Sequence, residues 1–152
     1  MMLGSVGNRR LALMKPKRPL IGSDVRSEFL DERLTRSVIG AFYAVYNALG
    51  YGYLESVYCA ALEYALRKRG HTVDREVSVE VFYDRVAIAW YRVDMLVDGR
   101  LLLELKSTQR LPPITPRQTL NLLKSTRLQL ALILHFGPEP AFYRLIHTDK
   151  RF

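Results

Sequence analysis

The clearest structural signal in this chain is the stretch Arg92-Val-Asp-Met-Leu-Val-Asp-Gly-Arg-Leu-Leu-Leu-Glu-Leu-Lys106. Two apolar segments flank Asp98-Gly99, a dipeptide typical of a β-hairpin turn. Charged residues interrupt both predicted strands: Asp94 interrupts the first, and Glu104 and Lys106 interrupt the second. A buried charge costs free energy unless it is paired or binds a metal ion. Three such residues within one hairpin therefore indicate a functional site.

The length of the hairpin loop determines whether these charges can meet. Side chains alternate between the two faces of a strand, so Glu104 and Lys106 share a face. A two-residue turn at Asp98-Gly99 would place Asp94 on the opposite face. A three-residue loop from Val97 to Gly99, or a bulge near Asp94, would place all three charges together. A real site requires one of these two features.

Length and composition indicate one globular domain. The chain has 152 residues, a formal charge of +8 and a pI of about 9.8. A basic protein suits a polyanionic partner such as nucleic acid, although many basic proteins bind none. The single cysteine, Cys59, excludes an internal disulfide and a cysteine-based zinc cluster, and we expect it to be a small core residue. No apolar run is long enough to span a membrane, so we expect a cytoplasmic protein without a membrane partner.

Hydrophobic periodicity predicts the order of the elements. Residues 1–25 are expected to form a mobile basic tail, and residues 26–152 a single domain. The predicted order is helix, helix, three strands, helix, strand, strand. The helices are predicted at 27–49, 54–69 and 117–125, and the strands at 77–83, 86–97, 100–107, 128–136 and 141–146. This order is typical of an α/β or α+β domain in which helices flank a mixed sheet.

Aromatic residues are concentrated in the first two predicted strands, as Phe82, Tyr83, Trp90 and Tyr91. We expect them to pack against the helices, with stacking on nucleobases as the alternative. His135, at the end of a predicted strand, is expected to be a structural histidine.

Two carboxylates and an amine on one strand face suit a hard divalent cation. Mg²⁺ prefers a few carboxylate oxygens, with water and substrate phosphate completing its coordination. The backbone carbonyl of Leu105, between Glu104 and Lys106, is a further candidate ligand. The alternative is a cross-strand salt bridge between Asp94, Glu104 and Lys106 on a half-exposed sheet.

Several motifs along the chain occur in an order that resembles the GxxExxY family. Gly52-Tyr-Leu-Glu55-Ser-Val-Tyr58 fits the pattern that names the family. The other matching segments are Ile39-Gly40-Ala41, Leu49-Gly50, Arg92-Val-Asp94, Leu103-Glu104-Leu105-Lys106, Gln118-x-x-Asn121-x-Leu123-Lys124 and Phe136-Gly137. The resemblance runs from about Leu34 to Gly137.

The GxxExxY family is placed among the PD-(D/E)xK nuclease-like proteins, which implies a restriction-endonuclease-like core of about four to five strands flanked by helices. The resemblance implies that Glu55, Asp94 and Glu104 bind Mg²⁺ and that Lys106 is catalytic. It also implies that Gln118 completes the site. From the residues alone, Glu55 is equally explained by the dipole of its helix, and Gln118 by an ordinary exposed position.

Two further residues near these motifs are candidates for support. Tyr58 is expected either to hydrogen-bond a carboxylate beneath the site or to be a core residue. Asn121, one turn beyond Gln118, is expected to cap or buttress the helix.

The resulting hypothesis is a nuclease that uses Mg²⁺, with Mn²⁺ as an alternative, and acts on DNA rather than RNA. The expected phosphate-binding residues are Arg110, Arg117, Lys124 and Arg127. The alternatives are a silent nucleic-acid-binding module of the same fold and a structural or interaction protein. A homodimer or a helicase-type partner is compatible with a chain of this size.

Overall fold

The computed structural model describes residues 24–148, and side chains from residue 31 onward. The predicted basic tail lies almost entirely outside the described residues. The elements are three helices, α1 (Asp24–Leu49), α2 (Glu55–Lys68) and α3 (Thr115–Lys124), and five strands, β1 (Val73–Tyr83), β2 (Val86–Val97), β3 (Leu101–Lys106), β4 (Leu130–Phe136) and β5 (Pro140–Ile146). No helix in this range is long and apolar enough to cross a membrane.

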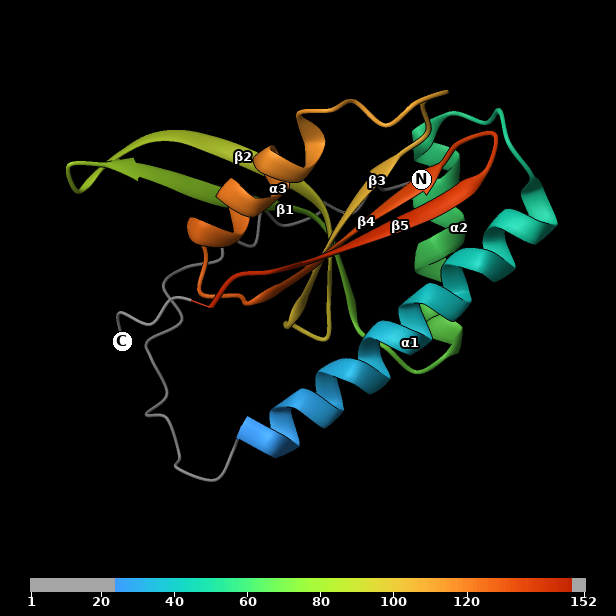
Figure 1. Ribbon diagram of the computed structural model, residues 1–152, viewed down its shortest axis with the longest axis horizontal. Helices are drawn as coiled ribbons and strands as arrows, with labels where there is room; N and C mark the ends of the chain where they lie inside the picture. Colours follow the sequence, from blue (N-terminus) through green and yellow to red (C-terminus); the bar gives the residue numbers. More distant parts are fainter. Residues whose placement is uncertain (1–23, 149–152) are drawn as a thin grey trace, which may run out of the picture.

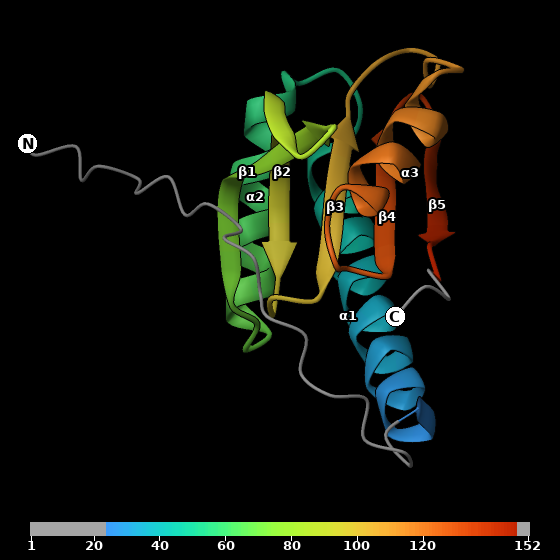
Figure 2. The ribbon, with the colours of Figure 1, turned by 90° about the vertical axis from the view of Figure 1, so that its left-hand side faces the viewer.

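The five strands form one mixed sheet in the order β1-β2-β3-β4-β5. All neighbours are antiparallel except β3 and β4, which are parallel and are joined through α3. Figures 1 and 2 show α1 and α2 on one face of the sheet and α3 on the other. The predicted mixed sheet flanked by helices is therefore confirmed.

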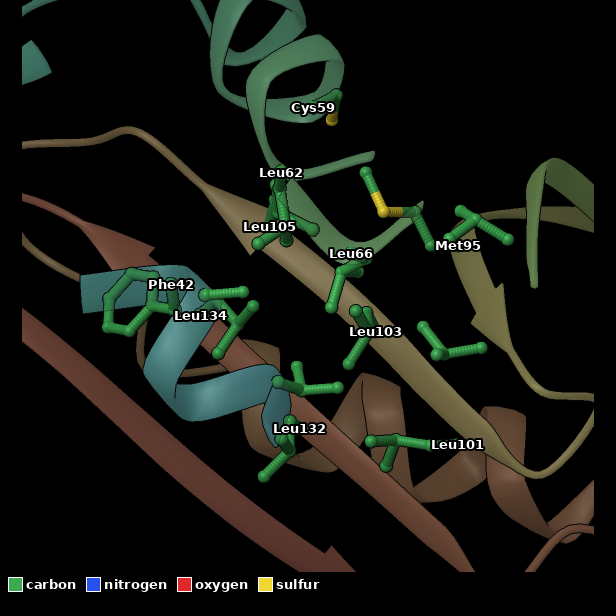
Figure 3. Packing of buried hydrophobic residues seen from close by; sticks show 14 of the residues in the cluster. Phe42, Cys59, Leu62, Leu66, Met95, Leu101, Leu103, Leu105, Leu132 and Leu134 are labelled. Carbon is green, nitrogen blue, oxygen red and sulfur yellow. The ribbon is translucent and has the colours of Figure 1, made fainter. Parts of the chain in front are cut away.

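Alternation along β3 explains the two apolar clusters of the molecule. Leu101, Leu103 and Leu105 point toward α1 and α2 and lie in the larger cluster, part of which Figure 3 shows. Leu102 points the other way and packs with Leu123 of α3. Because side chains alternate, Glu104 and Lys106 belong to the α3 face of the sheet. Cys59 is buried in the larger cluster, as predicted.

The connection between β2 and β3 has three residues, as the site requires. Val97 pairs with Leu101, so the loop comprises Asp98, Gly99 and Arg100, one position later than the loop predicted from Val97 to Gly99. Asp98 and Gly99 both have positive φ, at 52° and 65°. Continuing the register beyond Met95 and Leu103 places Asp94 opposite Glu104. The two acids therefore lie on the same face.

A polar cluster fixes this loop to the rest of the domain. His71 lies between two partners, with Nδ1 2.7 Å from Asp98 Oδ2 and Nε2 2.6 Å from Ser37 Oγ. Asp98 also accepts the backbone N–H of Thr72 at 2.8 Å. Although partial burial acts to raise the pKa of Asp98, hydrogen bonds from His71 and Thr72 lower it. Ser–His–Asp is also the order of a hydrolytic triad. Ser37 lies inside α1, however, where helix hydrogen bonds occupy the backbone N–H groups that an oxyanion hole needs. We interpret the cluster as a structural tie.

The sheet changes its packing partners at Asp94. Met95 and Val97 pack with α1 and α2, whereas Val93 packs in the α3 cluster. Glu76, the residue of β1 that faces Asp94 by register, has a φ of 50°. The register of β1 and β2 is the same on both sides of Glu76, so this irregularity is not the strand bulge near Asp94 that was the alternative to a three-residue loop.

Beyond this point β1 and β2 continue as a two-stranded ribbon, because β2 pairs with β3 only from Met95 to Val97. Figure 1 shows the ribbon projecting from the body of the sheet. The expectation that its aromatic residues pack against the helices was wrong, since all four are exposed: Phe82, Tyr83, Trp90 and Tyr91. Periodicity alone could not show that the two strands outrun their neighbour.

Candidate active site

Asp94 and Glu104 hold each other through the backbone. The backbone N–H of Leu105 donates to Asp94 Oδ2 at 2.7 Å. In return, the backbone N–H of Asp94 donates to the carboxylate of Glu104. The last backbone pair of β2 and β3 is Met95 with Leu103. Just beyond it, each carboxylate accepts a hydrogen bond from a backbone N–H of the opposite strand. We call this arrangement the carboxylate clasp, formed by Asp94 and Glu104.

The clasp is electrostatically unfavourable when both acids are ionised. Burial, and then the negative charge of Asp94, raise the pKa of Glu104 to about 8, against the lowering effects of Lys106 and the N–H of Asp94. Burial also raises the pKa of Asp94, although Leu105 N–H and Lys106 oppose the shift. Glu104 Oε1 is buried and has no hydrogen-bond partner in the described part of the chain. A cation at this position would satisfy both the charge and the free oxygen.

Glu55, the first residue of α2, lies near the carboxylate clasp. Burial, and then Asp94, raise the pKa of Glu55, while Lys106 and the backbone N–H of Ser107 lower it. These interactions bring the start of α2 to the end of β3. The structure therefore brings together four of the predicted residues: Glu55, Asp94, Glu104 and Lys106.

The predicted residues of α3 are not buried. Gln118 and Asn121 are both exposed on α3. Asn121 shares one helical stripe with Arg117 and Lys124, because the three are spaced by four and three residues. All four predicted phosphate-binding residues are exposed: Arg110, Arg117, Lys124 and Arg127.

Tyr58 is a core residue, and its hydroxyl does not serve a carboxylate. The ring is fully buried and stacks on Phe136, with 4.3 Å between ring centroids. The hydroxyl donates to the backbone carbonyl of Gly50 at 2.5 Å. Tyr58 therefore holds the connection that leads into Glu55, an indirect role that the spacing of three residues between Glu55 and Tyr58 could not reveal.

His135 is a structural histidine, as predicted. Its Nε2 lies 2.7 Å from the carbonyl oxygen of Thr108, a residue of the connection that follows Lys106. His135 pairs with Lys106 in the parallel register of β3 and β4. It therefore holds the loop that leaves the site.

Sequence reasoning missed Arg75. Its Nη1 lies 2.8 Å from Glu63 Oε2, and its positive charge lowers the pKa of Asp94. Its Nε is buried without a hydrogen-bond partner in the described residues. Arg75 lay outside the predicted strand, which began two residues later, at Val77, so nothing in the sequence indicated its place in the sheet beside Asp94.

A metal ion fits the clasp only with ligands from outside the protein. Among residues 24–148, no group of three or more histidine, cysteine, aspartate or glutamate side chains is arranged to hold a metal ion. Mg²⁺ is commonly bound by one or two carboxylates, with water and phosphate oxygens as its other ligands. The clasp, with its unpartnered Glu104 Oε1, provides that smaller set.

Comparison with known proteins agrees with this geometry. The family model of the PD-(D/E)XK nuclease superfamily matches residues 32–145, which run from within α1 to one residue short of Ile146, the end of β5. This chain belongs to the PD-(D/E)XK nuclease superfamily. Neither the curated proteins nor the solved structures contain a significant match.

Membership fixes the general class of the protein. The five-stranded mixed sheet with three helices is consistent with the restriction-endonuclease-like fold of the PD-(D/E)XK superfamily. Membership of the superfamily indicates nuclease activity and hence a nucleic-acid substrate. Members of the superfamily generally use divalent metal ions. The narrower assignment to the GxxExxY family stays a prediction.

Proposed function

We propose that this chain is a nuclease that hydrolyses phosphodiester bonds in DNA with Mg²⁺ or Mn²⁺. The observation that supports this most strongly is the carboxylate clasp: two half-buried acids at the end of a strand pair, both with raised pKa values, of which Glu104 has an unpartnered oxygen among the described residues. Two carboxylates held side by side partly away from water destabilise the folded state, and a structural salt bridge would give no reason for this pairing of like charges. A cation-binding role explains it.

The proposed roles follow from the position of each group. Asp94, Glu104 and the backbone carbonyl of Leu105 would hold the metal ion, and Glu55 would reach it through a water molecule. Such an ion polarises a phosphodiester and lowers the pKa of an attacking water. Lys106 stabilises the negative charge that develops on the phosphate, because its positive charge already acts on all three acids. Gln118 remains a proposed supporting residue.

Cleavage of labelled DNA tests the proposal. Wild-type protein should cleave in Mg²⁺ or Mn²⁺ and stop in EDTA. Glu104→Ala and Lys106→Ala should each lose at least about a hundredfold in rate, the usual scale for removing one transition-state contact. Glu32→Gln and Lys68→Ala, exposed residues of α1 and α2, are matched controls. Equal activity in all variants would indicate a contaminant and refute the proposal.

The same assay separates the rival functions. Salt-sensitive DNA binding without cleavage, unaffected by Glu104→Ala, would indicate a silent binding module. Absence of both binding and cleavage would indicate a structural protein. Parallel RNA substrates test the choice of DNA.

A further inference from the structure

Two half-exposed tyrosines stand directly before the first acid of the proposed site. The connection between α1 and α2, residues 50–54, has the sequence Gly-Tyr-Gly-Tyr-Leu, and Glu55 follows it. Tyr51 is 47% exposed and Tyr53 is 49% exposed. Tyrosine is enriched at binding interfaces, because its ring is apolar and its hydroxyl is polar. We call residues 50–54 the aromatic loop.

Several contacts fix the shape of the aromatic loop. Gly50 and Gly52 have φ values of 71° and 111°, and the second is accessible essentially to glycine alone. The hydroxyl of Tyr58 holds the Gly50 carbonyl and also accepts the backbone N–H of Tyr53 at 3.3 Å. The ring of Tyr53 meets that of Tyr58 edge-on, with centroids 6.0 Å apart.

This anchoring has an energetic consequence for binding. Tyr58 is itself stacked on Phe136 in the core. The backbone that carries the tyrosines is thus ordered before any ligand arrives, which reduces the entropy cost of binding.

The aromatic loop borders the proposed site on the side where the chain leaves β3. Glu55 accepts a hydrogen bond from Ser107, the first residue after β3. Figures 1 and 2 both place the α1–α2 and β3–α3 connections at the same end of the molecule. The second connection carries Arg110, which is exposed. The aromatic loop and Arg110 therefore lie at the same end of the molecule as the acids.

We propose that Tyr51 and Tyr53 form a stacking platform for unpaired nucleobases, so that the substrate enters the site as single-stranded DNA or as an unpaired end. This inference rests on the proposed nuclease function. Aromatic rings stack on the faces of bases, and those faces are accessible only when the base has left the duplex stack. The backbone phosphates of the same strand can then reach the acids and the neighbouring Arg110. A duplex offers phosphates but no free base face.

Binding measured without turnover tests the platform. Fluorescence anisotropy in EDTA, at fixed salt, compares three DNA ligands of equal length: a single strand, a duplex and an abasic single strand. The abasic strand keeps the phosphates and lacks the bases. Wild-type protein should bind the single strand roughly tenfold or more tighter than the abasic strand, since stacking on an aromatic side chain contributes about that factor per base.

The variants separate stacking from charge and from folding. Tyr51→Ala and Tyr53→Ala should each weaken single-strand binding by roughly tenfold and leave abasic binding unchanged. Tyr51→Phe and Tyr53→Phe should bind as wild type. Tyr64→Ala is the matched control, because Tyr64 is 71% exposed on α2, nine residues beyond Glu55 and outside the aromatic loop. Thermal melting confirms that each variant is folded.

The outcomes distinguish this proposal from the nuclease proposal. Equal affinity for abasic and normal single strands, or Tyr→Ala variants that bind as wild type, would overturn the platform even if the protein cleaves DNA. Tyrosine-dependent single-strand binding by a protein that never cleaves would keep the platform and overturn the nuclease.

Discussion

Burial and the negative charge of Asp94 raise the pKa of Glu104 to about 8, so we expect Glu104 to carry a proton at neutral pH in the metal-free protein. The sequence predicted the position and face of Glu104 from the alternation of β3. It could not predict the raised pKa, which depends on how deeply the hairpin is covered. The clasp itself, with backbone N–H groups shared between Asp94 and Glu104, also depends on a register that only the folded loop defines.

Stability should therefore fall as pH rises in the absence of metal. The ordinary pKa of the Glu104 side chain is 4.5. Between that value and about 8, the folded state holds a proton that the unfolded state releases. Within this window, one such group lowers the free energy of unfolding by up to about 1.4 kcal/mol per pH unit. Urea unfolding in EDTA at several pH values measures this slope.

Two variants make this test specific. Glu104→Gln is neutral at every pH, so it should show a clearly flatter profile, with the remainder due to Asp94 and Glu55. Glu32→Gln, on the exposed side of α1, should follow wild type. A Glu104→Gln profile as steep as that of wild type would show that Glu104 does not hold the proton.

The β2–β3 hairpin shows what patterning can and cannot define at the level of an element. Asp98-Gly99 and the flanking apolar runs identified both strands and the need for a three-residue loop. The loop nevertheless begins at Asp98 rather than Val97, because Asp98 takes part in the cluster with His71 and Thr72. Such a long-range contact leaves no local sequence signal. The start of β1 was also not visible in the local sequence: the strand begins at Val73 rather than at the predicted Val77.

This cluster should stabilise the hairpin measurably. His71→Ala leaves Ser37 and Asp98 without their shared partner, and should lower the free energy of unfolding by about 1–3 kcal/mol. Asp98→Asn keeps a residue that tolerates positive φ, so it tests the charge rather than the backbone. Urea unfolding of both single variants and the double variant gives the coupling between them. Losses that simply add would contradict a shared cluster.

At the scale of the whole molecule, the charge of +8 should govern non-specific affinity for nucleic acid. The logarithm of the binding constant for a single strand should fall linearly with the logarithm of salt concentration. Lys124→Ala should reduce the steepness of that line by roughly 0.7, the value for one phosphate contact on a single strand. Lys68→Ala, in the last turn of α2, should leave it unchanged. Identical slopes for the two variants would remove α3 from the proposed interface.

The central claim is that the carboxylate clasp binds a divalent cation in place of a proton. Calorimetric titration of the metal-free protein with Mn²⁺ at neutral pH, in buffers of different ionisation enthalpy, measures affinity and proton release together. Wild-type protein should bind Mn²⁺ and release close to one proton, because ligands bind metal in their ionised form. Asp94→Asn should bind much more weakly, and Glu104→Gln should both bind more weakly and release no proton. Mn²⁺ binding that is equal in all three proteins, or absent from wild type, would contradict the account.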